Sequence, residues 1–388
     1  MWYLKVDTLL LMLAAAVLFA AASTICMRLR PGFKLTPWLL VLDLGLLLYV
    51  DWQLAVFYVC YTALSYLLVL AIGAVKRGRK FWFVLFCLLD VAPFFYVRGA
   101  AFVPALPNFL VLVGFAYNML KAVDAVFYVY YTGEKIPVLT YANYLLFFPV
   151  LTAGPIFRYR DFLKAYHAPK ALTAQTVETS VKRLILGLFK KLVLAAFLMK
   201  ALNRVLQMSS HFYVSGALAL LSYVILYVDL SGYSDIAIAV GSFMGIPVPE
   251  NFKQPWTAAS FTQFWRKWHV TLSYFIREHI FVVVSGKRLS KWISALIGLI
   301  TMLVMSLWHE FSLLSLCTGF YMGSVLALEN LLGLTTVDKR RTPKALYVFR
   351  CLVVIGLFSV NAMFFTMSGS QLVQAIRGFF RLRKLQNF

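Results

Sequence analysis

The sequence predicts an all-α polytopic membrane protein, and three observations support that class. Hydrophobic residues make up 62% of the 388 positions and charged residues only 13%, whereas soluble domains carry about 25% charged residues. Apolar runs close to the roughly 20 residues that a spanning helix needs recur along the whole chain. No stretch between them has the length and polarity of a soluble domain or a disordered tail.

We expect about eleven transmembrane helices in a single integral-membrane domain over residues 1–388. The first run could be a signal peptide, but its n-region holds only Lys5 and its apolar part is longer than a typical h-region. We therefore expect it to be a retained span. The candidate spans are 8–26, 36–50, 53–75, 81–97, 109–131, 141–156, 184–206, 213–244, 292–308, 313–333 and 345–366.

Prolines interrupt several of these runs. Pro93, Pro149 and Pro155 lie inside apolar segments, and Pro155 stands just before the polar residues 158–161. Irregular backbone persists at membrane depth only where protein or a water-filled cavity satisfies its polar groups. We therefore expect re-entrant and interfacial helices around a central cavity, in addition to the spanning helices.

The net charge of +22 lies in short basic loops between apolar runs. Two of these loops, 28–34 and 76–80, are separated by two candidate spans and so fall on the same side of the membrane. Cytoplasmic loops collect lysine and arginine, which places both loops in the cytoplasm and the N-terminus outside. The same rule accounts for the charge without nucleic-acid binding.

Common catalytic and metal-binding motifs are missing from the sequence. His309 and Glu310 begin like the zinc motif HExxH, but Leu313 occupies the position of the second histidine, and the five cysteines form no CxxC pair. The sequence also contains no GxSxG elbow, P-loop or GxGxxG. We expect no metal site, which leaves imidazoles, buried acids and aromatic rings as the groups that could do chemistry.

His269 lies in the least membrane-like segment, 250–290. If 262–277 forms one helix, Trp265 and Trp268 fall on its apolar face and His269 on the opposite, polar face. One interpretation is an interfacial amphipathic helix anchored by its tryptophans. The other is a polar face that presents His269 to a reaction cavity, because an ionisable residue at membrane depth is a candidate functional residue by default.

His309 closes the apolar run 292–308, directly after Trp308. Imidazole has a pKa of about 6.5, so it can remove a proton from a hydroxyl near neutral pH. Burial would keep His309 in the neutral form that a general base needs. The alternative is a histidine that only caps a helix end by hydrogen bonding to the backbone.

The run 213–244 contains a polar stretch, which includes Asp229, Ser231, Tyr233, Ser234 and Asp235. Acids at membrane depth are usually paired, so one interpretation is an internal hydrogen-bond network. The other is a kinked helix that lines a reaction cavity and orients a histidine.

Four sequence words resemble those of the membrane-bound O-acyltransferase (MBOAT) family. Residues 148–159 (FPVLTAGPIFRY) are similar to its FFP…GPI.RY word, and 227–235 (YVDLSGYSD) to its Y.D.SGYSD word. Residues 249–252 (PENF) with 264–269 (FWRKWH) resemble P.NF…FWRRWH, and 306–309 (SLWH) resembles the final LWHG word. The four words lie in family order within about residues 110–330.

The resemblance implies an O-acyltransferase with a helical shell around a tunnel that two histidines face. It implies that His309 deprotonates or polarises an accepting hydroxyl as that hydroxyl attacks an acyl thioester, and that His269 assists. Glu310 departs from the family pattern, which has glycine after this histidine. The residues expected to support the cavity are Asp229, Ser231, Tyr233, Ser234, Asp235, Arg158, Trp265, Trp268 and Trp308.

Two bacterial branches of the family fit. D-alanyl transfer toward teichoic acid is favoured by the compact length, whereas acetylation of exopolysaccharides such as alginate is favoured by residues 187–193 (GLFKKLV) and 249–252. Because of the compact chain length, we slightly favour D-alanyl transfer. Either branch implies no permanently bound cofactor and a cytoplasmic thioester donor, which is a phosphopantetheinyl carrier protein or acetyl-CoA. Either also implies an envelope polymer as acceptor, a partner protein that completes the transfer outside, and the bacterial cytoplasmic membrane.

Two other classes of protein compete with the enzyme. A proton-coupled transporter or flippase would use His269, His309, Asp229 and Asp235 as a proton relay. It predicts matching broken helices in two halves, and the sequence contains no convincing internal repeat. A scaffold subunit of an envelope-polymer complex would use the histidines structurally, so only the enzyme would lose acyl transfer and keep its fold when His309 is changed.

Overall fold

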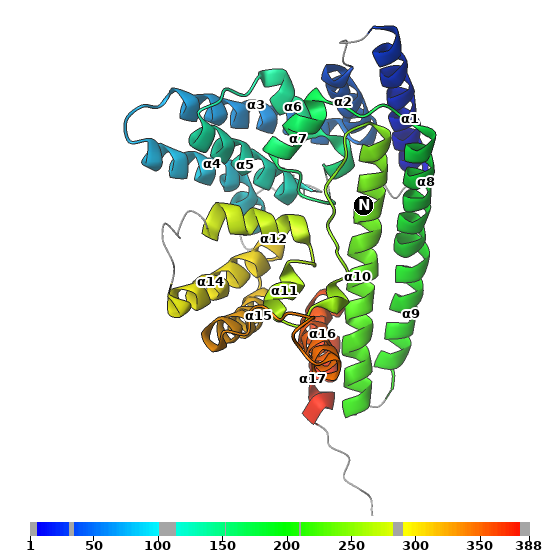
Figure 1. Cartoon of the computed structure of the whole chain (residues 1–388), viewed down its shortest axis with the longest axis vertical. Coiled ribbons are helices and arrows are strands. Elements are labelled where there is room, and N and C mark those ends of the chain that lie inside the picture. Colours follow the sequence, from blue (N-terminus) through cyan, green and yellow to red (C-terminus); the bar gives the residue numbers. More distant parts are fainter. Residues whose placement is uncertain are drawn as a thin grey trace, which may run out of the picture. The chain divides into compact units, whose positions relative to one another are not determined.

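The structure is a computed structural model that describes residues 6–30, 35–100, 114–151, 153–208, 211–281 and 290–380. Every regular element within these ranges is a helix, as the sequence predicts (Figure 1). Contacts divide the chain into two compact units. Unit 1 comprises Met1–Ile185 with Ser234–Glu250, and unit 2 comprises Leu186–Tyr233 with Asn251–Phe388. The expectation of a single domain over 1–388 stays a prediction.

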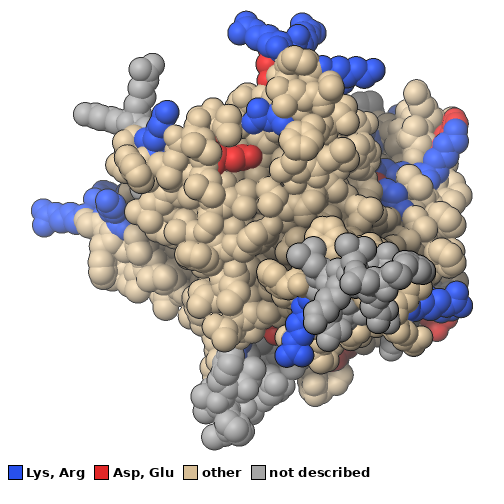
Figure 2. All heavy atoms as spheres, turned by 90° about the horizontal axis from the view of Figure 1, so that it is seen from below, with Lys and Arg blue, Asp and Glu red and all other residues tan. Residues whose placement is uncertain are grey.

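Five described helices are long and apolar enough to cross a membrane, each at a predicted span. Large apolar side chains are exposed on them, such as Leu18, Leu64 and Leu352, and these faces suit contact with hydrocarbon rather than water. Figure 2 shows a face on which uncharged residues form most of the surface. The expectation of about eleven spans stays a prediction. The five helices are α1 (Val6–Leu29), α3 (Trp52–Ala74), α10 (Phe212–Phe243), α14 (Lys291–His309) and α16 (Lys344–Thr366).

Unit 1 packs shorter helices against α3 around a core of buried aromatic rings. Tyr141, Tyr144 and Phe162 are almost fully buried in this core. In chain order the helices are α2 (Leu39–Val50), α4 (Arg79–Ala100), α5 (Phe115–Thr132), α6 (Val138–Leu146), α7 (Tyr159–His167) and the start of α8 (Ala174–Leu188).

The predicted span 141–156 is broken in the structure, as its prolines indicate. Helix α6 ends at Leu146 and a 3-10 turn follows at Phe148–Val150. Buried side chains satisfy the freed backbone groups: Lys121 Nζ donates to the Leu145 carbonyl (2.9 Å), and Asp43 Oδ1 accepts from the Phe148 N–H (3.1 Å). Irregular backbone at this point is therefore held by protein.

Unit 2 contains the two histidines singled out from the sequence. Leu202 and Leu206 of α9 pack with Val214 and Leu218 of α10 in one apolar core. Figure 1 shows α9 running beside α10. The described elements of unit 2 besides α10, α14 and α16 are the π-helical turn η4 (Phe189–Leu194), α9 (Ala195–Leu206), the 3-10 turn η5 (Pro255–Thr257), α11 (Phe261–Trp265), α12 (Val270–Ile276), π-helical η6 (Arg277–Phe281), α15 (Leu313–Leu332) and α17 (Gly369–Phe380), with the end of α8.

Candidate functional site

The segment around His269 is two short helices with a turn between them. Helix α11 ends at Trp265, and α12 begins at Val270. The predicted single helix over 262–277 is therefore wrong. The reason is tertiary: at the break the Lys267 carbonyl accepts from the Lys253 N–H and the Val270 N–H donates to the Asn251 carbonyl, so these backbone groups bond to another segment instead of continuing a helix. Glu329 of α15 accepts from the backbone N–H groups of Phe261 and Thr262 and fixes the start of α11.

His269 occupies the turn, as the residue that precedes α12. Its backbone is left-handed, with φ 45° and ψ 52°, a conformation that few residues other than glycine adopt. Only 5% of the residue is exposed, and its Nδ1 atom has no hydrogen-bond partner among the described residues. The prediction that His269 lies on a polar face is wrong, because the break in the helix turns it inward while Arg266 stays exposed.

The surroundings of His269 favour the neutral imidazole. Burial, and to a smaller extent the charge of a protonated His309, lower the pKa of His269 from its usual 6.5 to about 3. This effect of His309 links the two imidazoles electrostatically within unit 2. His269 therefore carries a free lone pair and no charge near neutral pH.

His309 is the last residue of α14, as the sequence predicts. Its ring packs against Trp308 (centroids 4.6 Å apart) and against Phe365 of α16 (5.6 Å). The expected burial of His309 is wrong, because the residue is exposed at the helix end. Glu310 follows in extended backbone, so the chain leaves the helix at the departure from the family word.

Aromatic rings fix the turn that carries His269. Trp268 stacks on Phe264 (5.5 Å, 17°) and contacts Phe358 of α16 (4.7 Å). Trp265 also contacts Phe358 (5.9 Å), and its indole Nε1 is buried without a hydrogen-bond partner among the described residues. The two tryptophans expected on one apolar face therefore both reach α16.

The polar stretch of α10 forms no break, since the helix runs unbroken from Phe212 to Phe243. In unit 2, Asp229 Oδ1 pairs with Lys191 Nζ (2.5 Å), and Lys191 also lies over the Tyr233 ring (5.1 Å). Ser231 is buried, and its hydroxyl lies 3.5 Å from the Val228 carbonyl oxygen. This arrangement matches the interpretation as an internal network.

The remaining supporting residues belong to unit 1. Asp235 Oδ1 accepts from Arg183 Nε (2.9 Å), and Arg183 Nη2 donates to Glu250 Oε2 (2.5 Å). Ser234 is buried. Arg158 Nη2 donates to Asp161 Oδ2 (2.6 Å). The expectation that Arg158, Ser234 and Asp235 support the same cavity as the histidines stays a prediction.

The sequence analysis did not identify the two cations that bind Asp229 and Asp235. Lys191 and Arg183 lie on η4 and α8, about 40 to 50 positions before the acids that they bind. The acids themselves indicate such partners, because an acid in an apolar helix needs a cation or a hydrogen-bond donor nearby. Sequence separation hid which cation it was.

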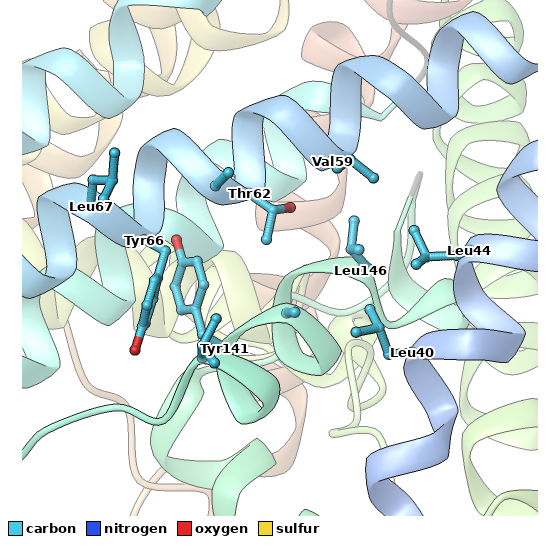
Figure 3. Close-up of a pocket in the computed structure, with 11 residues that line it drawn as sticks. Leu40, Leu44, Val59, Thr62, Tyr66, Leu67, Tyr141 and Leu146 are labelled. Carbon is cyan, nitrogen blue, oxygen red and sulfur yellow. The ribbon is translucent and has the colours of Figure 1, made fainter.

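Unit 1 contains an apolar cavity of about 360 Å³ between α2, α3 and α6 (Figure 3). Its lining includes Leu44, Thr62, Tyr66 and Tyr141. The three hydroxyls bond to protein: Thr62 to the Tyr58 carbonyl, Tyr66 to the Ile136 carbonyl and Tyr141 to Ser65. The cavity therefore offers shape to an apolar group but no catalytic group. Nor do three His, Cys, Asp or Glu side chains converge to hold a metal ion anywhere in the described ranges.

The comparisons with known proteins agree with the sequence words. Residues 39–370 match the family model of the membrane-bound O-acyltransferase family. A protein of Pseudomonas putida described as a probable alginate O-acetylase AlgI is 30% identical over 254 residues, which are 65% of this chain and 52% of that protein. A peptidoglycan O-acetyltransferase of Helicobacter pylori is 32% identical over 178 residues, 44% of this chain and 33% of that protein.

A teichoic acid D-alanyltransferase of Streptococcus thermophilus is 27% identical over 310 residues, 74% of this chain and 71% of that protein. The chain spans about half the length of the Pseudomonas putida relative that it matches. The family model, by contrast, covers most of this chain, including both histidines and all four sequence words. The chain belongs to the membrane-bound O-acyltransferase family.

Proposed function

We propose that this protein transfers an acetyl group from a thioester donor to a hydroxyl of a cell-envelope polysaccharide. The observation that carries the proposal is the pair of histidines in unit 2, one buried in the strained turn before α12 and one at the end of α14. Two of the relatives described above are named as O-acetylating proteins. The transporter alternative has no support from the relatives, which are named as transferases.

His309 is the general base in this proposal. A polymer hydroxyl attacks the thioester carbonyl, its proton passes to the imidazole of His309, and the thiolate leaves with that proton. Exposure at the end of α14 makes His309 accessible to an incoming hydroxyl. General-base catalysis of this kind contributes about 10²–10⁴-fold to the rate.

His269 assists as a neutral group. With a pKa of about 3 it stays uncharged at neutral pH, so it can accept a hydrogen bond from the acyl donor molecule or from the attacking hydroxyl. A second charge beside a protonated His309 would oppose proton transfer, and the neutral state avoids it.

We further propose on which side of the membrane the donor and the acceptor lie. The donor is acetyl-CoA or an acylated carrier protein in the cytoplasm, and the acceptor polymer lies outside with a partner protein that completes the transfer. The basic loops 28–34 and 76–80 would then meet the phosphates of the donor on the cytoplasmic side of a bacterial inner membrane, with the N-terminus outside.

D-alanyl transfer is the second candidate. The D-alanyltransferase of Streptococcus thermophilus aligns over 71% of its own length, a larger share than either O-acetylating relative described above. The chemistry at His309 is the same for both acyl groups, so the donor distinguishes them.

The test is a transfer assay in proteoliposomes with polysaccharide acceptor present. Wild type, His309→Ala and the control His211→Ala would receive radiolabelled acetyl-CoA and, separately, D-alanyl carrier protein. His211 stacks on Tyr213 outside the candidate site, so its variant should act like wild type. We expect His309→Ala to lose about 10²–10⁴-fold of its rate with one donor and keep its melting temperature. Normal turnover by His309→Ala would show that the catalytic assignment is wrong.

A further inference from the structure

The segment Asn251–Lys253 clamps the turn that carries His269. The Val270 N–H donates to the Asn251 carbonyl (2.9 Å), and the Lys253 N–H donates to the Lys267 carbonyl (2.9 Å). These two backbone bonds bracket His269 and Trp268. Between them the Phe252 ring packs edge-on against Trp268 (5.1 Å, 90°) and lies 6.4 Å from the His269 ring.

The turn needs such support for a conformational reason. A non-glycine residue with φ 45° is strained, and such strain persists only where the surroundings determine it. His269 precedes α12 at the position where a polar side chain usually caps a helix, yet its imidazole makes no capping bond. The first N–H groups of α12 therefore require another acceptor.

Asn251 supplies that acceptor from another part of the chain. Its Oδ1 accepts from the backbone N–H of Thr271 (3.2 Å) and from the Thr271 hydroxyl (2.9 Å). Thr271 is the second residue of α12, where a capping side chain would normally bind. Both side chains are buried, Asn251 to 2% exposure and Thr271 to 6%.

We propose that Asn251 is the positioning residue for His269. It caps α12 in place of the residue at the capping position, so the His269 imidazole is free of that task and keeps its Nδ1 for the reaction. Asn251 acts through the backbone at residues 270 and 271 and does not itself touch substrate. The catalytic importance of this role rests on the proposed function. The structural role of Asn251 can be tested without measuring acyl transfer.

Two substitutions separate the capping role from general packing. Asn251→Ala removes the acceptor, whereas Asn251→Asp keeps it at the N-terminal end of α12, where an added negative charge is favourable. Tyr321→Phe is the matched control. It removes one part-buried hydrogen bond of unit 2, from the Tyr321 hydroxyl to the Leu357 carbonyl (2.9 Å), and leaves the bonds between Asn251 and Thr271 in place.

The first readout is the reactivity of the His269 imidazole. Diethylpyrocarbonate would be applied to detergent-solubilised protein, and the modified histidines would be quantified by mass spectrometry with His211 as the internal reference. We expect slow modification of His269 in wild type and Asn251→Asp, because the residue is buried. Asn251→Ala should raise its rate several-fold, and Tyr321→Phe should leave it unchanged. An unchanged rate in Asn251→Ala overturns the inference.

The second readout is the transfer assay. Because a small misplacement of a catalytic group costs about 100-fold, Asn251→Ala should lower kcat by about that factor with little change in KM. Asn251→Asp should restore most of the rate. Equal losses in Asn251→Ala and Tyr321→Phe would overturn the inference. Raised His269 reactivity without any acyl transfer by wild type would instead count against the proposed function alone.

Thr271→Val is a second, milder variant that tests the same contact if Asn251→Ala does not accumulate as folded protein. This variant removes only the hydroxyl of the same pair and leaves the backbone bond in place. It should raise the reactivity of His269 and lower kcat less than Asn251→Ala does. Wild-type values for both quantities would count against the clamp.

Discussion

The imidazole of His269 combines burial, a strained backbone and an unengaged ring nitrogen. The strained backbone and the buried nitrogen without a hydrogen bond each cost stability. Such a combination in one residue is typical of a group held ready for chemistry. His279 provides the contrast within unit 2: its Nδ1 lies 2.8 Å from the Phe275 carbonyl oxygen and its ring stacks on Phe275, so it serves the helix.

The lowered pKa of His269 predicts how stability depends on pH. Between about pH 6.5 and pH 3 the unfolded chain binds a proton at this residue and the folded chain does not. The unfolded state therefore gains stability on acidification, and the free energy of unfolding falls as pH falls. At pH 5 this residue should cost on the order of 2 kcal/mol relative to pH 7.

The check is a comparison of wild type with His269→Gln, which cannot titrate. Melting temperatures in detergent at pH 7 and pH 5 would be measured for both. We expect wild type to lose more on acidification than His269→Gln does, with the other histidines cancelling in the comparison. Equal losses would mean that His269 titrates normally in the folded protein.

At the scale of elements, helices α14 and α15 meet through two glycines. A Cβ on Gly319 would lie 2.8 Å from Leu303 Cα, and one on Gly323 would lie 2.9 Å from Leu299 Cα. Gly319 and Gly323 form a GxxxG pattern, which lets membrane helices approach closely. The pattern is visible in the sequence, where the two glycines stand four positions apart. The consequence is functional, because α14 ends in His309.

Substitution of Gly323 by alanine should push the two backbones apart. The Leu299 side chain, whose Cδ1 lies 2.7 Å from such a Cβ, can rotate, but the Leu299 Cα and carbonyl oxygen at 2.9 and 3.0 Å belong to the backbone and cannot. We therefore expect a loss of about 1–3 kcal/mol, as for other overpacked cores. Gly298→Ala is the control on the same helix pair, since its Cβ would meet Leu326 Cβ at an ordinary 3.7 Å. Thermal melting in detergent would compare them, and equal melting temperatures would refute close packing at Gly323.

The packing of α10 against η4 is a feature that residue propensities do not predict. A Cβ on Gly232 would meet the Gly187 carbonyl oxygen at 3.0 Å and the Lys191 nitrogen at 3.1 Å, so α10 lies directly against the π-helical turn. This contact brings Lys191 to Asp229. Neither the turn nor the pairing follows from residue periodicity, since both arise where two helices cross.

At the scale of the whole molecule, the charge distribution predicts the membrane topology. Loops 28–34 and 76–80 should both be cytoplasmic, which requires two crossings between them. Helix α3 is long enough, but the apolar helix Thr36–Val50 is shorter than the other candidates. At 1.5 Å per residue it spans about 22 Å, against about 30 Å of hydrocarbon. The topology therefore depends on this segment.

Single cysteines at positions 30 and 77 would test the topology in a protein without its native cysteines. A membrane-impermeant maleimide should label both positions only after the membrane is permeabilised. Labelling of the two positions from opposite sides would show that Thr36–Val50 does not complete a crossing. Labelling of both in intact cells would reverse the predicted orientation.

The sequence by itself determined the class of fold, the family and the residues of interest. Apolar runs of membrane length dictate helices because lipid offers no partner to the backbone, and histidines are rare enough in such runs for His269 and His309 to stand out. The family model, which matches residues 39–370, confirmed the predicted family.

Only the tertiary structure decided how those residues are held. Two contacts join residues that are distant in the sequence: the cap that Asn251 provides for α12, and the pairing of Asp229 with Lys191. The break before α12 depends on the first of these contacts. Local periodicity favoured one continuous helix over 262–277, but the hydrogen bonds that Asn251 accepts from Val270 and Thr271 outweigh that preference. A strained turn is stable only through contacts with other elements, and the sequence alone does not specify those contacts.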